Sequence, residues 1–332
     1  MPRSSRRVGL ALIAVLAGGA AAVGGAMLSS SEAAPAPSDG ALATAAGLDR
    51  LHGLPPVTDR MFGHAEVLSR SAEAQRQYSI ACMAEHGFRY APPPTPTPAE
   101  DGDQRPRPFG LEAPPSAAPA RKPLGETPPK PGSEAATKAY QRALFGDEDR
   151  RVSAKGAHGM AVTRPGDGCL AEAEKRVLGD GVGGRMRWLQ VRILLFEAQE
   201  QARANVEKDP AFRNATARWQ QCMNDYGFPG QRDPSTLLKT LPTQRARLNG
   251  RDILKADLRC KGETGYLTIA YTRLAAVQQG WLDRNPAVEK DWRKLLDRQD
   301  KAAREVLATK PPVPSASAAS ATSPASSAPR SG

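Results

Sequence analysis

The chain has 332 residues and a formal net charge of +11, but only 5% of its residues are aromatic and 30 are proline. The proline-rich and small-residue segments bury too little apolar surface to offset the entropy of ordering, so about two hundred residues remain for a core. This leaves room for one modest domain. Because the cations are interspersed with acids and lack interleaved aromatic residues, we expect no specific nucleic acid partner.

Residues 1–33 have the pattern of an export signal. Three arginines (Arg3, Arg6 and Arg7) precede an uncharged, mostly apolar stretch from Val8 to Ser31, and small residues lead up to Ala33. This order predicts a signal peptide cleaved after Ala33. The alternative is a retained transmembrane anchor, because the uncharged stretch is long enough to span a bilayer. Either reading predicts that the rest of the chain is secreted or held in the cell envelope, outside the cytoplasm.

The remaining chain divides by composition into a domain and disordered segments. Residues 34–58 are small, polar and punctuated by proline, which predicts a disordered tether. A helical domain is expected over 59–310, and an insertion at 92–133 with fourteen prolines is expected to be disordered with polyproline II character. The Pro/Ala/Ser tail at 311–332 is also predicted to be disordered.

Within the domain, apolar residues recur at helical spacing. Helices are expected over 64–87, 134–145, 169–178, from 185 to the Asp209-Pro210 helix start, and over 235–248, while 146–168 has the composition of a loop. One long helix, with a face running from Ile253 to Trp281, is followed after Asn285-Pro286 by a second that reaches about Ala308. Alternating strand patterns are absent. The predicted fold is all-α, with these two long C-terminal helices forming a hairpin or a kinked pair.

An internal pseudo-repeat relates residues 59–180 to residues 185–310. Each half contains Cys-Met-x-x-x-Gly-Phe, then a loop, then Cys-x-x-Glu, with the cysteines at Cys82 and Cys169 in the first half and Cys222 and Cys260 in the second. Four cysteines in an exported chain indicate two disulfides, for which three pairings are possible. The internal likeness favours Cys82–Cys169 and Cys222–Cys260.

The repeated motif also predicts how a helix ends in each half. With Gly87 or Gly227 as the left-handed residue after the helix, Met83 or Met223 occupies the third position before the cap. The apolar contact of such an end then joins Met83 to Phe88 and Met223 to Phe228. The motif is therefore interpreted as a structural helix cap with a disulfide, used twice.

Metal binding is the competing interpretation of the cysteines. Cys82 and His86 are four residues apart on one helix face, but Tyr226 stands at the equivalent position after Cys222. A zinc site needs a closer cluster of nitrogen and sulfur ligands, and a redox pair would need Cys-x-x-Cys. We therefore predict no metal, no cofactor and no redox activity.

The second motif and the residues that follow it resemble a known type of exported protein. Asp209-Pro210 through Trp219, Cys222-Met223, Gly227-Phe228 and the run from Ala256 to Gly265 resemble an uncharacterised family of secreted or lipid-anchored actinobacterial helical proteins. The resemblance covers roughly residues 205–300, and it implies export and disulfides but no activity. This chain departs from the lipid-anchored members because it has no N-terminal lipid-accepting cysteine.

No catalytic motif is present in the sequence: there is no nucleophile elbow, zinc-protease helix, phosphate loop or dinucleotide fingerprint. The surplus of cations lies in residues 185–310, with 24 Lys plus Arg against 15 Asp plus Glu. These features predict a non-enzymatic protein that binds an anionic cell-wall polymer, a lipid surface or an envelope protein. The alternative is a cell-envelope enzyme whose active site has no recognisable motif.

Overall fold

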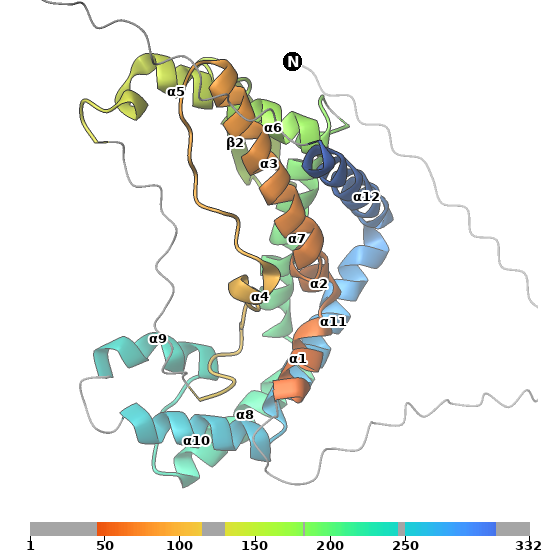
Figure 1. Ribbon diagram of the computed structural model, residues 1–332. Coiled ribbons are helices and arrows are strands. Elements are labelled where there is room, and N and C mark those ends of the chain that lie inside the picture. The colour runs from red at the N-terminus through yellow and green to blue at the C-terminus, as the bar shows by residue number, and fades with distance from the viewer. Residues whose placement is uncertain (1–44, 115–129, 182, 245–249, 310–332) are drawn as a thin grey trace, which may run out of the picture. The chain divides into compact units, whose positions relative to one another are not determined.

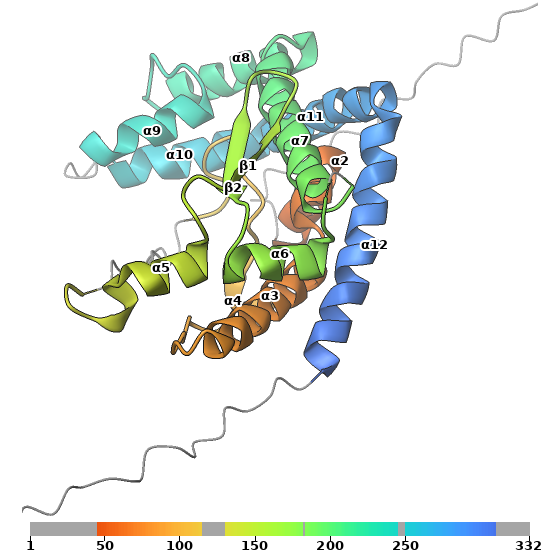
Figure 2. The same ribbon diagram turned by 90° about the horizontal axis from the view of Figure 1, so that it is seen from above.

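The computed structural model describes residues 45–114, 130–181, 183–244 and 250–309 (Figures 1 and 2). The predicted export signal and the C-terminal tail lie outside these residues. In the described part the regular secondary structure is helical apart from a two-stranded antiparallel sheet, which confirms the all-α fold class. In chain order the elements are α1 (Ala45–Gly53), α2 (Pro56–Phe62), α3 (Ala65–Glu85), α4 (Pro98–Asp101), η1 (Glu134–Ala136), α5 (Lys138–Phe145), β1 (Arg151–Lys155), β2 (Ala161–Pro165), α6 (Cys169–Leu178), α7 (Arg185–Val206), α8 (Pro210–Asp225), α9 (Pro234–Gln244), α10 (Gly250–Glu263), α11 (Tyr266–Arg284) and α12 (Pro286–Ala308).

Helix α7 connects the main packing regions. Its buried Val191 and Leu195 pack with Trp292 of α12, whereas Ala202 and Val206 belong to a second core with α8, α10 and α11. The next helix begins as predicted, because Asp209 accepts hydrogen bonds from the backbone N–H groups of residues 211 and 212. The apolar faces of these helices are therefore buried against one another, as expected for an all-α core.

The predicted tether is in part folded. Residues 45–53 and 56–62 form α1 and α2, and Leu48, His52 and Val57 are buried. The start of α2 is held by Gln278 of α11, whose buried side-chain oxygen accepts the N–H groups of Val57 and Thr58 at 2.9 and 3.1 Å. The prediction of disorder is wrong for residues 45–58, because a side chain distant in the sequence accepts the otherwise unpaired N–H groups at the start of α2.

The front of the proline-rich insertion is also folded. Residues 92–114 follow α3, form the short α4, and continue towards helices α8 and α10 (Figure 1). Phe109 and Glu112 are each only 4% exposed. The prediction of disorder is therefore wrong for 92–114, while 115–129 lie outside the described residues.

A β-hairpin occupies the segment that was predicted to be a loop. Strands β1 and β2 pair from Arg151 with Pro165 to Lys155 with Ala161, and Ala154 packs on Leu189 and Ile193 of α7. The turn is fixed by Glu197 of α7, whose carboxylate accepts three backbone N–H groups from residues 157, 158 and 160 at 2.7 to 3.3 Å. The prediction that the chain has no strands is therefore wrong for this segment.

The C-terminal helices differ from the prediction in one place. The apolar face expected on one helix from Ile253 to Trp281 is divided between α10 and α11, because Gly265 adopts a left-handed conformation with φ of 62°. The second break falls at Asn285 as predicted, and α12 leaves α11 in a new direction, so the two form a kinked pair rather than a hairpin (Figure 2). In the described part of the chain, no helix is both long and apolar enough to span a bilayer.

Candidate functional site

The structure confirms both predicted disulfides. Cys82 of α3 is bonded to Cys169 at the start of α6, and Cys222 of α8 is bonded to Cys260 of α10. Each bridge joins the last turn of one helix to a neighbouring helix. Two structural disulfides are typical of proteins that fold in an oxidising, extracellular environment.

Both helix ends have the predicted left-handed glycine, and backbone hydrogen bonds close each of them. The N–H of Phe88 donates to the carbonyl of Met83 and the N–H of Phe228 donates to that of Met223, each at 2.9 Å. Gly87 and Gly227 have φ of 81° and 82°. Met83 and Met223 are fully buried, in the clusters on which Phe88 and Phe228 pack. The motif is therefore a helix end stabilised by hydrogen bonds and apolar contact.

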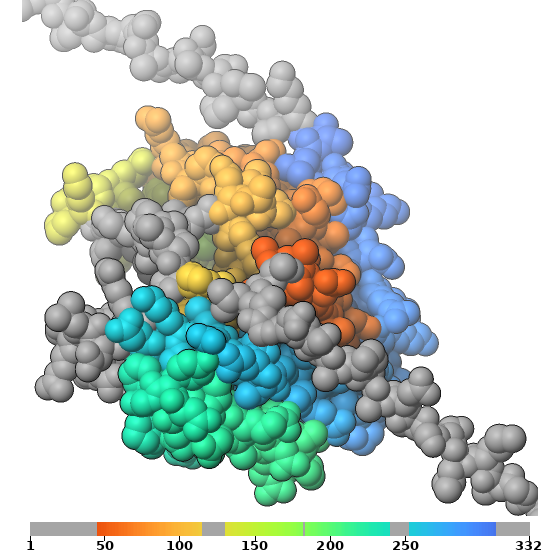
Figure 3. All heavy atoms as spheres, turned by 90° about the horizontal axis from the view of Figure 1, so that it is seen from below, coloured from red at the N-terminus to blue at the C-terminus, as the bar shows by residue number. Residues whose placement is uncertain are grey.

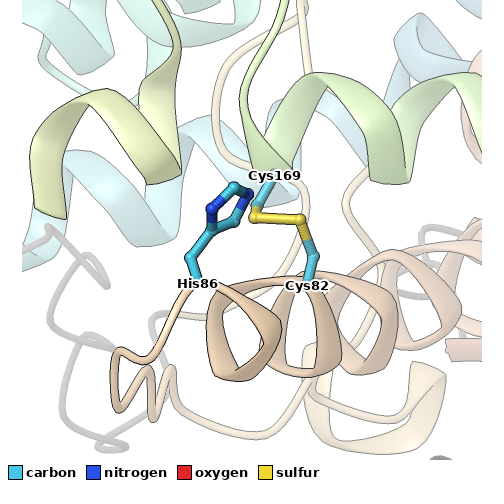
Figure 4. A group of neighbouring side chains, drawn as sticks. All are labelled: Cys82, His86 and Cys169. Carbon is cyan, nitrogen blue, oxygen red and sulfur yellow. A yellow bond between two sulfur atoms is a disulfide. The ribbon is translucent and has the colours of Figure 1, made fainter. Parts of the chain in front are cut away.

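Figure 4 shows that the ring of His86 lies beside the first disulfide. Among the described residues, the donor atoms of Cys82, His86 and Cys169 lie within 4.8 Å of one another, which is a spacing suited to one metal ion. The two sulfur atoms are bonded to each other, however, and a disulfide sulfur lacks the negative charge of the thiolate that binds zinc. In this oxidised form the group is a cross-link with a neighbouring imidazole.

A different group, which the sequence did not indicate, lies where the proline-rich insertion crosses the second half of the chain. We call residues 103–113 the strap. Phe109 at its centre packs against Phe212, Tyr266 and Tyr271, with ring centroids 5.1 to 6.5 Å apart. In Figure 3 the gold atoms of the insertion lie close to the orange atoms of the N-terminal helices and the cyan atoms of the C-terminal half. An aromatic anchor thus fixes a segment that has little regular secondary structure.

Two strap carboxylates bind the imidazole of His52 on α1. Nε2 of His52 lies 2.5 Å from Glu112 and Nδ1 lies 3.1 Å from Asp103, while the hydroxyl of Tyr271 donates to the other oxygen of Glu112. The hydrogen bond to Glu112 raises the pKa of His52, with a further contribution from Asp103, although burial of the ring opposes it. This arrangement favours the imidazolium form, in which both ring nitrogens donate.

Tyr271 is held in its neutral form. Burial raises the pKa of its hydroxyl, and the adjacent carboxylate of Glu112 raises it further. The hydroxyl therefore donates to Glu112 and is not available as a base. Both groups on this side of the strap serve to bind its carboxylates to α1 and α11.

A cavity of about 180 Å³ lies beside the strap. Its polar lining comes from five helices and the strap, and includes His52, Thr58, Arg107, Arg203, Lys239 and Tyr271. Its apolar wall includes Pro55, prolines of the strap, and leucines of α9 and α11. We call this space the strap cavity, and its size suits a phosphate, a carboxylate or a single sugar unit rather than a large cofactor.

The cations of the strap cavity are incompletely neutralised. Arg107 approaches Glu112 only to 3.8 Å and its side chain is 53% exposed. Arg203 and Lys239 form no ion pair with any residue that the structure describes. Glu200 is an exposed acidic residue in the lining, and Glu112 and Asp103 already pair with the imidazolium of His52, so the three other cations face this one carboxylate. Such a cavity attracts an anionic group.

Sequence reasoning could not find this site. Its residues come from segments up to 222 positions apart, from His52 to Leu274, and no spacing rule links them. The single signal was the surplus of cations in residues 185–310, which includes Arg203 and Lys239 but does not place them. No protein family model, curated protein or solved structure matches this chain. The resemblance to exported actinobacterial proteins therefore stays a prediction.

Proposed function

We propose that this chain is an exported, non-enzymatic binding protein that accepts an anionic group of a cell-envelope component in the strap cavity. The observation that carries the proposal is the set of cations (Arg107, Arg203 and Lys239) that line a small cavity without full neutralisation. Oxyanions bind well where cationic donors converge and part of the surrounding water is excluded. The component is an anionic cell-wall polymer, and a lipid headgroup would offer similar chemistry.

Export is part of this proposal. The signal-like residues 1–33 support it, and so do the two disulfides, which persist in oxidising compartments. A cleaved signal would release the domain, whereas a retained anchor would hold it at the membrane. In both cases the strap cavity would face the envelope and its anionic polymers.

The lining supports binding more than catalysis. Both ring nitrogens of His52 lie against carboxylates and the hydroxyl of Tyr271 donates to Glu112. The imidazole and the phenol of the lining are thus already engaged, whereas a general base needs a free lone pair within reach of its substrate. Among the described residues Arg203 and Lys239 have no ion-pair partner, so their donors can bind an anion.

The test measures binding of the purified protein to anionic cell-wall polymer and, separately, to phosphatidylglycerol vesicles. We expect the R203Q/K239Q double variant to bind at least about tenfold more weakly, because two charge-assisted contacts are lost. The matched control is R213Q/R218Q, which removes the same charge from exposed positions on α8. We expect the control to stay within about twofold of the wild type at about 0.15 M salt.

The outcomes separate the possibilities. Polymer binding without vesicle binding identifies the cell wall as the source of the anion, and the reverse identifies the lipid. Equal weakening in both double variants would mean that diffuse surface charge, not the cavity, causes binding. Failure of the wild-type protein to bind either material would contradict the proposal.

A further inference from the structure

A buried pair of reactive groups lies on α10, behind the strap. Asp257 and Lys261 are four residues apart, so they share one face of the helix. Their side chains are each only 1% exposed, and Nζ of Lys261 lies 2.9 Å from Oδ2 of Asp257. Trp219 and Tyr266 are buried in the same apolar cluster as the adjacent Cys260. An amine and a carboxyl group are therefore held in contact away from bulk water.

The neighbouring groups orient both partners. The indole N–H of Trp219 donates to Oδ1 of Asp257 at 3.0 Å, which leaves Oδ2 facing the amine. Nζ of Lys261 also donates to the backbone carbonyl of Leu111 in the strap. Oδ1 is thus polarised by a donor, while Nζ is held between the strap carbonyl and Oδ2 of Asp257.

Burial favours the neutral forms of both groups. It raises the pKa of Asp257 and lowers the pKa of Lys261, and their mutual attraction only partly opposes this. Moving the proton from the ammonium to the carboxylate therefore costs less here than in water. A neutral amine next to a protonated carboxyl group is the reactant pair for amide formation.

We propose that Asp257 and Lys261 form an intramolecular isopeptide bond. The lone pair of Nζ attacks Cγ of the protonated carboxyl group, the Cγ–Nζ bond forms and the Cγ–Oδ2 bond breaks. Oδ2 leaves as water, taking the carboxyl proton and one of the two amine protons. The products are one secondary amide and one water molecule, so the step needs no oxidant, reductant or other reactant.

The surroundings fit the product as well as the reactants. Oδ1 becomes the amide carbonyl oxygen and keeps the hydrogen bond from Trp219, while the remaining N–H on Nζ donates to Leu111. The amide cannot ionise and each of its polar atoms keeps a partner, so the product avoids the desolvation penalty of a buried ion pair. Holding the two groups in contact also gives an effective concentration far above that in solution, up to about 10⁵–10⁸ M in favourable cases.

The same helix provides an internal reference. Asp252 and Lys255 also form an ion pair, at 3.3 Å, but their side chains are 67% and 79% exposed. Water stabilises the charged forms of this pair, so we expect no bond between them. The comparison tests whether burial, and not sequence proximity alone, produces the bond.

The experiment is mass spectrometry of the full chain after incubation in the folded state at neutral pH. The protein is then denatured, its disulfides are reduced and alkylated, and peptides that contain residues 252–263 are analysed. We expect a mass lower by one water molecule, localised to fragments that contain both Asp257 and Lys261, with no tryptic cleavage after Lys261. The full sequence mass in these peptides would overturn the proposal.

Two variants, K261R and D257N, test the identity of the bond, and a third, W219F, tests the role of the indole N–H. K261R should keep the full mass, and D257N should lose one ammonia instead of one water because it forms the same amide. Loss of water that persists in K261R, or that hydroxylamine reverses, would indicate a succinimide at Asp257 and overturn the proposal. W219F retains an aromatic ring but not the N–H to Oδ1, and we expect slower bond formation in this variant. Each mass is measured on denatured protein, and the wild-type result alone decides the case if a variant fails to fold.

Discussion

The two Cys-Met-x-x-x-Gly-Phe motifs have nearly the same local structure, although they lie in different halves of the chain. In both, a left-handed glycine ends a helix, the following phenylalanine N–H donates to the methionine carbonyl, and the cysteine bonds to a neighbouring helix. What differs is the sequence separation of the bonded cysteines, which is 87 in the first half and 38 in the second. We call the two helix ends and their disulfides the frame. The two halves differ in the residues that lie in the loop between the bonded cysteines.

Both loops contribute to the candidate site. The longer loop contains the strap, which places Arg107 in the lining and binds His52 through Asp103 and Glu112, whereas the shorter loop contains α9 and supplies Lys239. The strap packs on the other half of the pseudo-repeat through Phe109 and through Leu111, which accepts from Lys261. One half thus provides a segment that completes the core of the other, and the strap cavity forms where they meet.

The largest effect should follow from removing a disulfide. In the chain-entropy model, C82A/C169A loses about 5 kcal/mol of unfolding free energy and C222A/C260A about 4 kcal/mol, because the first bridge closes the longer loop. The difference between the two variants is about 0.7 kcal/mol. Urea unfolding of both double variants measures it.

The reverse order of the two losses in unfolding free energy would contradict this prediction. A larger loss in C222A/C260A than in C82A/C169A would show that loop length does not set the relative contribution of the two bridges. The wild-type protein under reducing conditions provides the upper limit, because it lacks both bridges while all side chains are retained.

The next effect tests whether the strap belongs to the core of the second half. We expect F109A to lose about 3–5 kcal/mol, as for other buried phenylalanines. A glutamate-specific endoprotease should also cut after Glu112 more rapidly than in the wild type, because the strap loses its anchor. The control is M160A at the exposed hairpin turn, which should change stability by no more than about 0.5 kcal/mol. Unchanged stability and proteolysis in F109A would mean that the strap is only loosely attached.

The sequence predicts the frame well because the frame is local. A glycine, a methionine and a phenylalanine within six positions define a helix end, and a repeat of that pattern orders the cysteines. The strap was missed because proline-rich composition indicates only the lack of regular structure. Its order comes from Phe109 and Glu112, whose partners lie about 100 to 160 positions along the chain.

The hairpin and the break before α11 were missed for related reasons. Each strand has five residues and only Ala154 is buried, so the alternating signal is weak, and the turn depends on Glu197 from another element. Apolar spacing continues in register from α10 into α11, which concealed the break at Gly265. Glycine in that position was the available signal. The strap cavity has no local signature at all.

A smaller effect should be equal in the two motifs. G87A and G227A each place a side chain in a left-handed conformation, where an L-residue costs about 1–2 kcal/mol, although open space surrounds both positions. The control is G183A, which meets no neighbouring atom within 4 Å and lacks a positive φ. Urea unfolding should show similar losses for the first two variants and little change for the third. A loss in only one motif would mean that the two helix ends are not energetically equivalent.

The smallest effect is a pH dependence of the unfolding free energy, which should come from the strap and not from the disulfides. His52 faces Glu112 and Asp103, and Tyr271 and Arg107 contact the same carboxylate of Glu112. Because the pKa of His52 is raised in the folded state by Glu112 and Asp103, its contribution to stability is fully present below about pH 6.5 and is lost as the pH rises through the folded value. We therefore expect the wild-type protein to lose more unfolding free energy than H52Q between about pH 6 and about pH 9. The disulfides do not titrate in their bonded form, so this difference isolates the link between α1 and the strap. Parallel pH profiles for the wild-type protein and H52Q would show that the imidazolium does not hold the strap in place.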